Sequence, residues 1–546
     1  MTKYVFTMGG VVSSLGKGIA SATLGGLLKA RGYKVRLRKM DPYLNMDPGA
    51  LNPYQHGETF ITEDGACTDL DLGHYERFSG INCHKTDSVS GGRIYYNVLS
   101  REQRGEYMGA TVQMIPHVSN ELKLFMDSDL TDEDFVLYEV GGTVGDIEGT
   151  LFLEAVRQFM NEKGRQNCCV VYLTLLPYIE TAGELKTKPT QQAVKKLLEA
   201  GIQANVLLCR SKVPLGEEER KKLALFCNVP SNNVVSALDV GNIYELPLSY
   251  HEQGLDTCVL DYFGIHSNVD LSQWERIVAT MKNFKYRTKI AVVGKYCHLE
   301  DAYKSLKEAI THAGINQETK VDIDWVDSED LENISDADLE AKLSVYQGIL
   351  VPGGCGQKGT DGILRAIRYA REKNVPYFGI CLGFQLSVIE AIRNLYGEQN
   401  ANSTEFTPDC VPVIDRMMIT EKEGVFVVEP DVNGTHSKKR LGNDTCALTP
   451  DSLVAKLYGT TTVAERHHNR YEMNNTFVPA LEEKGVKITG SSHDGLLPEF
   501  LEIPSHPFYV ATMAHPEFSS KPFIPHPLFV GFIKATLKKA GMLNEE

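Results

Sequence analysis

Short apolar runs alternate with longer amphipathic segments in two separate series along this chain. The first series contains YVFTM, SATLGGLLKARG and KVRLRKM, and it continues with FVLYEV, CCVVYLTLL and ANVLLCR. The second begins at KIAVVGKY and continues with YKSLKEAITHAG, VDIDWV, GILVPGG and VPYFGICLG. Strands that alternate with helices usually form a parallel sheet covered by helices. The pattern therefore predicts an α/β fold with two domains, each a mostly parallel sheet flanked by helices.

The two series meet in a polar stretch with one helix-like segment, LSQWERIVATMKNF. The chain has 546 residues, which is more than one hydrophobic core normally accommodates, so two or three domains are expected. We expect a first domain over residues 1–265, a linker over 266–287 and a second domain over 288–546.

Charge and composition argue against several classes of protein. The formal net charge of -15 disfavours the attraction to phosphate backbones on which nonspecific nucleic-acid binding depends. No segment reaches the roughly 18 apolar residues of a membrane span, and the N-terminal segment lacks the long apolar region of a signal peptide. The 12 cysteines are scattered without a C-x-x-C pair, which favours reduced thiols. We therefore expect a cytoplasmic protein that binds neither nucleic acid nor membranes.

A glycine-rich segment, GGVVSSLGKG, follows the first apolar run and precedes a helix-like segment. Backbone N–H groups in such a loop can surround a phosphate at a helix N-terminus, and Lys17 would supply positive charge. The usual pattern is not matched fully, because five residues separate Gly10 from Gly16 and Gly18 stands where a serine or threonine is usual. A phosphate loop and a plain glycine-rich turn both remain open.

Two acidic residues are candidates for the magnesium ligand that Gly18 cannot provide. Glu139 ends the apolar run FVLYE, at the edge where open α/β sheets bind ligands, and Asp71 lies in TDLDLGHYE. Either carboxylate alone is more often a cap or a surface group. Next to a lysine-bearing loop, the sequence favours a metal-bound nucleotide.

The second series contains a candidate nucleophile. VPYFGICLGFQ is an apolar run that ends in Gly379-x-Cys381-x-Gly383 and continues into a helix-like segment, the layout of a nucleophile elbow. The glycines permit a tight turn, and the following helix N-terminus favours a thiolate. A buried structural cysteine is the alternative.

A nucleophilic cysteine needs a base and a group that orients the base. His515-Pro516-Glu517 follows the run YVATMA near the C-terminus, so one strand would place both side chains together. Gly354 in VPGGCG could donate a hydrogen bond to an oxyanion. Together these segments predict acyl-transfer chemistry at Cys381.

GICLGFQ with HPE resembles the class I, triad-type glutamine amidotransferases. The resemblance implies that Cys381 attacks glutamine, that His515 moves protons and that Glu517 orients the histidine, with ammonia as the product. Longer blocks resemble the CTP synthase family over essentially the whole chain: GGVVSSLGKG, KMDPYLN, QHGE, TEDGA, TDLDLGHYERF, GATVQMIPH, EVGGTVGDIE, GELKTKPTQ and LFCNVP.

The family resemblance implies a phosphate-loop synthetase domain, similar to dethiobiotin synthetase, fused to the glutaminase. It also implies a ligase that aminates UTP to CTP through a 4-phosphorylated UTP, with ATP and Mg2+. Its ATP contacts map onto Ser14, Leu15, Gly16, Lys17, Gly18, Ile19, Lys39, Asp71, Leu238, Asp239 and Val240. Its UTP and CTP contacts map onto Ser13, Asp146, Ile147, Glu148, Lys186, Thr187, Lys188, Pro189, Thr190, Gln191 and Lys222. Its glutamine contacts map onto Gly354, Leu382, Gly383, Phe384, Gln385, Glu405 and Arg470, and its metal ligands onto Asp71 and Glu139.

Further expectations follow from the same resemblance. They are GTP as an allosteric activator, CTP as a feedback inhibitor, a homotetramer that can form filaments, and an ammonia passage near His56 and Thr59. Two alternatives stay open: another ATP-dependent glutamine amidotransferase of the cobyrinic-acid type, and a catalytically silent nucleotide-binding filament protein.

The chain departs from the family at its second glycine turn, which usually reads GGFG followed closely by arginine. Here Cys355 replaces the aromatic residue and Lys358 the arginine, and residues 431–440 also differ from the family. Loss of an aromatic face and of a planar donor fork predicts weaker GTP binding, near Lys304, Lys358 and Arg440. Neutral loop substitutions are the alternative.

Overall fold

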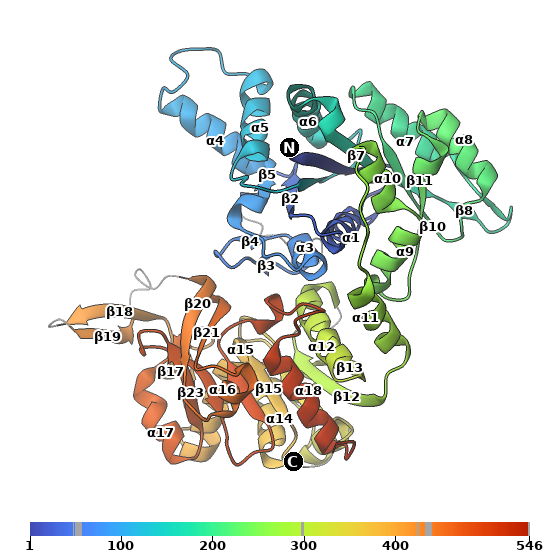
Figure 1. Ribbon diagram of the computed structural model, residues 1–546. Helices are drawn as coiled ribbons and strands as arrows, with labels where there is room; N and C mark the ends of the chain where they lie inside the picture. Colours follow the sequence, from blue (N-terminus) through green and yellow to red (C-terminus); the bar gives the residue numbers. More distant parts are fainter. Residues whose placement is uncertain (47–48, 50–56, 296–299, 423–424, 432–438, 544–546) are drawn as a thin grey trace. The chain divides into compact units, whose positions relative to one another are not determined.

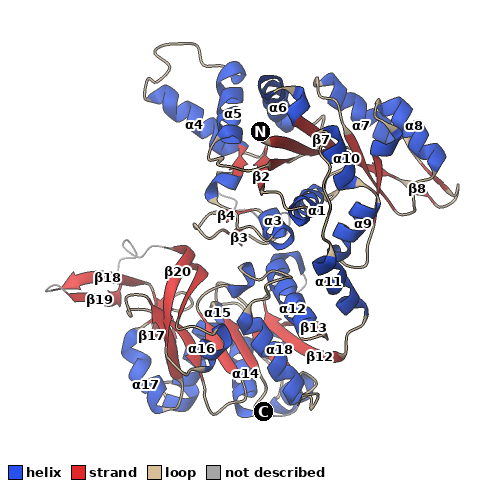
Figure 2. Cartoon of the chain, viewed as in Figure 1, coloured by secondary structure: helices blue, strands red, loops and turns tan. Residues whose placement is uncertain are grey.

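The computed structural model divides the chain into two compact units (Figures 1 and 2). It describes all residues except 47–48, 50–56, 296–299, 423–424, 432–438 and 544–546. The first unit comprises Met1–Leu51 with Thr68–Ala279, and the second comprises Asn52–Cys67 with Thr280–Glu546. The division after Ala279 falls within the stretch expected as a linker. Asn52–Cys67 belongs to the second unit, although the sequence analysis assigned it to the first domain.

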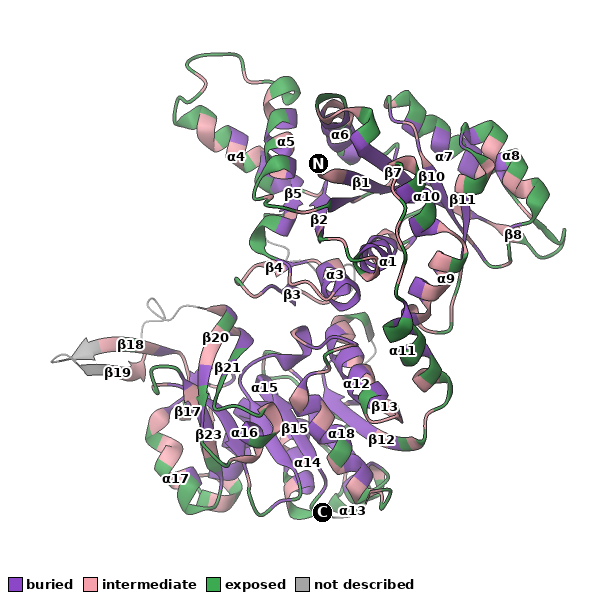
Figure 3. Ribbon diagram, viewed as in Figure 1, coloured by how far each residue is buried: buried purple, intermediate pink, exposed green. Residues whose placement is uncertain are grey.

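The first unit is built on a parallel sheet. Within the described residues it has seven strands in the order β11-β10-β7-β1-β6-β2-β5, and all neighbours run parallel. The strands are β1 (Lys3–Gly9), β2 (Val35–Asp41), β5 (Ser88–Ser90), β6 (Phe135–Val140), β7 (Cys168–Leu176), β10 (Val206–Ser211) and β11 (Val234–Leu238). These strands are short and most of their residues are buried, because helices cover both faces of the sheet (Figure 3).

Helices from the long amphipathic segments cover this sheet. Alternate residues of β1, Tyr4, Phe6 and Met8, share a core with α5 (Ser119–Asp127), α6 (Thr150–Lys163) and α7 (Lys188–Glu199). On the other face, α1 packs against β1, β2 and β6. The remaining helices and short strands are α1 (Lys17–Ala30), α3 (Asp71–Ser79), α4 (Gly91–Gln103), α8 (Glu217–Cys227), α9 (Leu246–Glu252), α10 (Leu255–Tyr262), β8 (Tyr178–Ile179) and β9 (Glu184–Leu185). The bounds of α11 (Ser272–Lys282) and β4 (Cys67–Thr68) cross the division between the units.

The second unit contains a mixed sheet. Over the described residues its nine strands follow the order β13-β12-β14-β15-β25-β24-β23-β20-β21, parallel from β13 to β25 and antiparallel from there onward. The strands are β12 (Tyr286–Gly294), β13 (Thr319–Asp327), β14 (Gly348–Val351), β15 (Tyr377–Ile380), β20 (Arg440–Leu448), β21 (Thr462–Asn469), β23 (Lys487–Ser492), β24 (Pro498–Glu502) and β25 (Tyr509–Thr512).

Two apolar cores lie on opposite faces of this sheet. One contains residues of α12 (Lys304–Asn316), α16 (Leu453–Tyr458) and α18 (Pro527–Lys539), and the other contains residues of α13 (Asp336–Leu343), α14 (Thr360–Glu372), α15 (Leu382–Ala391) and α17 (Val478–Glu483). Shorter strands of this unit are β3 (Phe60–Ile61), β16 (Ala401–Ser403), β17 (Val411–Asp415), β18 (Met417–Lys422), β19 (Val425–Pro430) and β22 (Glu472–Met473). Among the described helices, none is long and apolar enough to cross a membrane.

Both units confirm the predicted α/β class. In a parallel sheet the carboxyl ends of all strands lie at one edge, where ligands bind. The loops that follow β1, β2 and β6 therefore meet in the first unit, and those that follow β12, β14, β15 and β25 meet in the second. The glycine-rich loop and Glu139 lie at the edge of the first sheet, and the glycine turn, Cys381 and His515 lie at that of the second, whereas Asp71 comes from the start of α3.

Candidate functional site

The glycine-rich segment forms a strained loop between β1 and α1. Gly16 caps the helix with a φ of 99°, and Val11 and Ser14 also have positive φ values of 83° and 55°. Positive φ is costly for residues other than glycine and often marks a functional site. A β-carbon on Gly10 would lie 2.0 Å from Tyr172 Oη, so only glycine fits there. The loop ends at the N-terminus of α1, the position at which phosphate sites occur.

Gly18 lies directly against Asp71. A β-carbon at position 18 would lie 1.9 Å from Asp71 Oδ1. The carboxylate at the start of α3 therefore occupies the space that a serine or threonine side chain at position 18 would need. An oxygen ligand is present at this place in the fold, although it comes from another helix.

Lys17 folds back over the loop. Its Nζ donates to the carbonyl of Gly142 at 2.7 Å, and its methylene groups lie against Gly9. Burial lowers the pKa of Lys17, while Glu139 opposes this change. The lysine thus joins the glycine-rich loop to the loop after β6.

Lys39 of β2 stands among four carboxylates. Its ammonium contacts Asp71 and lies 3.4 Å from Glu139 Oε1. It is also 3.6 Å from Asp69 Oδ1 and 3.8 Å from Asp41 Oδ1. Burial alone would lower the pKa of Lys39, but the carboxylates outweigh it and raise that pKa well above its usual range.

The four carboxylates around Lys39 carry more negative charge than the lysine can balance. Burial, with repulsion between carboxylates, raises the pKa of Asp71 and of Glu139. Burial also raises the pKa of Asp41 to about 8. A divalent cation would relieve this excess, and Mg2+ prefers carboxylate oxygens. Asp71 and Glu139 beside a phosphate loop therefore fit a magnesium ion bound to phosphates.

Arg210 connects two parts of the predicted ATP site that are distant in sequence. Its Nη1 donates to the carbonyl of Leu15 at 3.0 Å, and its Nη2 lies 2.9 Å from Asp239 Oδ1. Leu238 ends β11, so Asp239 and Val240 lie at the same sheet edge as the loop. The sequence analysis missed Arg210; an arginine near the end of the apolar run ANVLLCR was the available signal.

The residues predicted to contact UTP and CTP lie in separate segments. Lys186 pairs with Glu184, and residues 188–191 form the first turn of α7, where Thr190 is buried and bonds to Thr174 at 2.9 Å. Lys222 lies in α8, which packs against α7. Ser13 is exposed in the phosphate loop.

The segment of Asp146 to Glu148 borders a different feature. Ile147 and Glu148 line a cavity of about 730 Å³ whose other walls are mostly apolar, with Leu44, Leu99 and Met114 among them. The side chain of Lys196, in α7, lies against Gly145, so α7 adjoins this loop.

Cys381 stands at a sharp turn between β15 and α15. Its φ of 50° and ψ of -95° are unusual for a residue other than glycine. A β-carbon on Gly379 would lie 2.7 Å from Tyr377 Oη, and one on Gly383 would lie 2.5 Å from the Val351 carbonyl. Close packing thus requires both glycines, and the thiol is held at the N-terminus of α15.

His515 and Glu517 follow β25 and lie together. Nδ1 of His515 is 2.7 Å from Oε1 of Glu517. Burial disfavours the charged imidazole, but Glu517 and Cys381 outweigh burial and raise the pKa of His515 to about 10. A charged imidazole held by a carboxylate beside a cysteine is the arrangement of an activated nucleophile.

The glycine turn after β14 packs against this pair. A β-carbon on Gly353 would lie 2.5 Å from Cε1 of His515, and one on Gly354 would lie 3.1 Å from Cδ2 of Leu382. Glu405 accepts a hydrogen bond from the amide of Gly356 at 2.7 Å. The turn therefore lies beside His515 and the first residue of α15, with the Glu405 carboxylate fixing its far end.

Comparison with known proteins decides the family. A model described as CTP synthase N-terminus matches residues 3–265, and one described as Glutamine amidotransferase class-I matches residues 298–535. CTP synthases from Azospirillum brasilense and Acidiphilium cryptum (strain JF-5) are each 54% identical to this chain, over 100% of both lengths. The chain belongs to the CTP synthase family. A solved glutaminase domain of Trypanosoma brucei CTPS with bound acivicin is 34% identical, covers 46% of this chain and 94% of its own, and has a TM-score of 0.42.

Several predicted glutamine contacts of this CTP synthase family member lie around Cys381. Leu382, Gly383, Phe384 and Gln385 form the first turn of α15. Nε2 of Gln385 donates to the carbonyl of Tyr471 at 3.1 Å, which ties the helix to the neighbour of Arg470. Arg470 itself is exposed after β21.

Residues around His515 were missed by the sequence analysis. The ring of Phe518 stacks on His515 with centroids 5.4 Å apart, and Phe60 meets Phe518 edge-on at 5.4 Å. Nη1 of Arg466 donates to the carbonyl of Ile61 at 2.9 Å, and the backbone carbonyl of Arg466 accepts from the His515 amide at 2.7 Å. These contacts explain why Phe60 and Ile61 belong to the second unit. Thr59 is half-buried before β3, and His56 lies outside the described residues.

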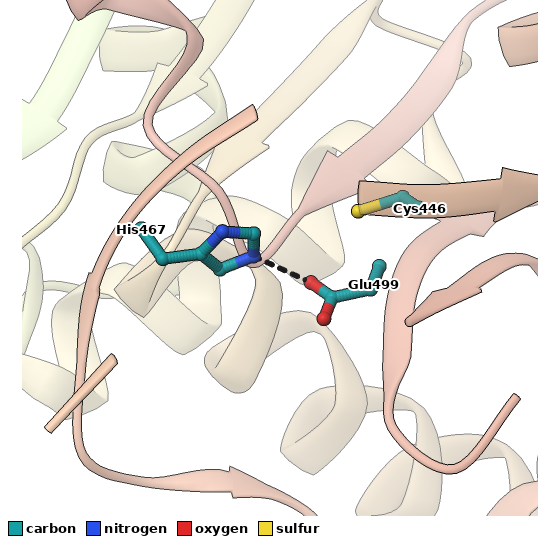
Figure 4. Close-up of side chains that lie close together, drawn as sticks. All are labelled: Cys446, His467 and Glu499. Carbon is teal, nitrogen blue, oxygen red and sulfur yellow. Dashed lines mark hydrogen bonds and ion pairs between the residues drawn. The ribbon is translucent and has the colours of Figure 1, made fainter. Parts of the chain in front are cut away.

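A second cluster, Cys446, His467 and Glu499, is buried on β20, β21 and β24 (Figure 4). His467 Nε2 lies 2.8 Å from Glu499 Oε2. Residues of these types can hold a metal ion. Here, however, Nη2 of Arg440 lies 2.6 Å from the other oxygen of Glu499, so a fixed cation already balances that carboxylate. Because Arg440 also pairs with Asp444 and Glu472, we interpret the cluster as part of a buried ion network.

Proposed function

We propose that this chain converts UTP to CTP, with ATP as the activating co-substrate and glutamine as the nitrogen donor. The observation that supports it most is the pairing of two sites in one chain of this family. A buried Cys381–His515–Glu517 arrangement suits amide hydrolysis, and a lysine-bearing glycine loop with buried carboxylates suits phosphoryl transfer.

In the glutaminase unit, Cys381 attacks the side-chain amide of glutamine and His515 moves the proton to the leaving ammonia. Glu517 holds the imidazole through Nδ1. The amides of Gly354 and Leu382 would receive the charge that develops on the carbonyl oxygen. Arg470 suits the substrate carboxylate, since its planar fork can bind both oxygens.

In the first unit, ATP phosphorylates oxygen 4 of UTP, because a carbonyl oxygen is a poor leaving group. Lys17 and Lys39 neutralise charge as the phosphoryl group moves. Asp71 and Glu139 would hold Mg2+, which supplies further positive charge to the phosphates when bound. Ammonia then displaces phosphate, and it must arrive unprotonated because ammonium has no lone pair.

UTP and ATP would bind at the residues that the family resemblance indicates. The lysines of residues 186–191 and Lys222 suit the UTP triphosphate, while residues 146–148 suit the ring of UTP or of the inhibitor CTP. ATP would lie along residues 14–19 and 238–240, the segments that Arg210 connects. We propose that residues 1–265 form the synthetase domain and residues 288–546 the glutaminase domain, with a linker between them. We also propose that the protein is a cytoplasmic homotetramer that can form filaments.

GTP would activate the glutaminase. Lys358 is exposed and pairs with Glu329 at 2.7 Å, and Lys304 pairs with Glu308 at 3.0 Å. Arg440 is bound by three carboxylates, which favours a structural role over a nucleotide contact.

The test is direct. Purified protein is incubated with UTP, ATP and Mg2+, with either glutamine or ammonium, and CTP is measured in each mixture. We expect CTP in both, and none from Lys17→Ala. Glutamine hydrolysis without CTP in either mixture would favour a different amidotransferase, and the absence of both activities would favour a silent binding protein.

A further inference from the structure

Lys295 is a buried lysine immediately after β12, and its ammonium reaches the glycine turn beside the nucleophile. Nζ donates to the carbonyl of Cys355 at 3.0 Å and to the carbonyl of Gly356. Only 8% of Lys295 is exposed. We propose that Lys295 is a positioning residue for glutamine hydrolysis, which holds residues 353–356 in the conformation that presents the amide of Gly354 to the oxyanion. This inference rests on the proposed glutaminase function.

The turn needs such an anchor because three of its four residues are glycine. Glycine has the largest conformational freedom of any residue, so an untied glycine turn samples many backbone orientations. A β-carbon on Gly353 would lie 2.5 Å from His515, so that position excludes a side chain, while one on Gly354 would only press on Leu382 at 3.1 Å. The fold must therefore restrict this backbone from outside the turn.

Lys295 and Glu405 restrict it by holding the two ends of one peptide group. The carbonyl of Cys355 and the amide of Gly356 belong to the same peptide plane. Lys295 donates to the carbonyl, while Glu405 accepts from the amide at 2.7 Å. A peptide flip would break both charge-assisted hydrogen bonds at once, and such bonds are about twice as strong as neutral ones. One further peptide, between Gly354 and Cys355, separates this group from the peptide that carries the Gly354 amide, so the restraint reaches that amide through one intervening peptide of the same turn.

Burying the Lys295 ammonium costs solvation free energy. Burial lowers the pKa of Lys295, so the ammonium is less favourable here than in water. Its own carbonyl accepts from Tyr303 Oη at 2.6 Å, and Nζ lies 5.7 Å from the ring of Phe406. An apolar side chain would fill this space without the desolvation cost, but it would leave the carbonyls of Cys355 and Gly356 without these donors.

The experiment compares Lys295→Met with Lys289→Met, a control on β12 whose half-buried lysine pairs with Asp324. For Lys295→Met we expect kcat with glutamine to fall by about 10- to 100-fold. The loss should not exceed that caused by removing an oxyanion donor outright, because the Gly354 amide is still present. Ammonia-dependent CTP formation should stay unchanged. Alkylation of Cys381 by iodoacetamide should also proceed at the natural rate, because that reaction needs the thiolate and no oxyanion. Lys289→Met should match the natural protein in all three assays.

Two more variants keep the inference testable. Lys295→Gln is smaller and polar, and it should show the same selective loss if Lys295→Met does not fold. Lys295→Arg keeps the charge and several donors, and it should retain more glutaminase activity than either. An undiminished glutaminase, a parallel loss of ammonia-dependent synthesis, or slower alkylation of Cys381 in a folded variant would overturn the positioning role. If the natural protein hydrolyses glutamine but makes no CTP, the proposed function fails while the glutaminase comparison still decides on Lys295.

Discussion

The carboxylate of Asp71 occupies the space beside Gly18 in which phosphate loops usually carry a serine or threonine side chain. The imperfect sequence pattern therefore has a structural cause. Position 18 carries no hydroxyl, and the carboxylate of Asp71, at the start of α3, lies where that hydroxyl would be.

Restoring the usual residue should consequently harm the protein. We expect Gly18→Ser to abolish CTP formation from glutamine and from ammonium alike, because its β-carbon would lie 1.9 Å from Asp71 Oδ1. Glutamine hydrolysis by Cys381 serves as the internal control for folding of the second unit. A Gly18→Ser protein with normal ammonia-dependent turnover would show that Asp71 is not needed at this position.

The two chemical steps should separate at Cys381. Cys381→Ala is expected to lose glutamine-dependent CTP formation entirely and to keep synthesis from added ammonium, since the nucleophile acts only in nitrogen release. CTP is measured with each nitrogen source at saturating UTP and ATP. Loss of both activities in a well-folded variant would contradict this division of labour.

The pKa of His515 predicts a pH-dependent effect of Glu517. In the folded protein that pKa is raised to about 10, so the protonated imidazole stabilises the fold fully below its unfolded pKa near 6.5, and this contribution is lost as pH rises toward 10. Glu517→Gln removes the carboxylate that raises the pKa. We expect its melting temperature to lie below that of the natural protein at pH 6.5, and the difference to shrink by pH 9.5. A difference that grows with pH would contradict the assignment of the proton to His515.

The departures at Cys355 and Lys358 predict weak activation by GTP. A thiol lacks the aromatic face of phenylalanine, and lysine is a point charge where arginine is a planar fork. We expect the natural protein to need more GTP for half-maximal glutamine-dependent turnover than the Cys355→Phe, Lys358→Arg double variant. Ammonia-dependent turnover is the control, and equal or tighter activation of the natural protein would reject the prediction.

Local sequence was sufficient to predict the α/β elements and the turn that carries Cys381. The apolar runs and the glycine spacing around Cys381 placed it at a strand-to-helix turn, and the structure has this turn between β15 and α15. His515 and Glu517 are only two residues apart, so their 2.7 Å contact could also be anticipated. The resemblance to the CTP synthase family, carried by blocks over the whole chain, was confirmed by relatives that match it end to end.

Other parts of the site could not be predicted because they depend on contacts between residues far apart in the chain. Lys295 and Cys355 are separated by 60 residues, and Arg210 and Leu15 by 195. No period or motif links such pairs, since their positions follow from the order of strands in a sheet.

The sequence by itself determined the α/β class, the two series of elements, the elbow at Cys381 and the glycine loop before α1, because each depends on backbone preferences within a few residues. Only the tertiary structure decided that Asp71 fills the space beside Gly18, that Phe60 packs in the unit of His515, and that Lys295 and Glu405 hold one peptide of the glycine turn. Parallel strands bring their carboxyl ends to one edge of the sheet, and segments from elsewhere in the chain, such as α3 and β3, supply further contacts that no local pattern contains.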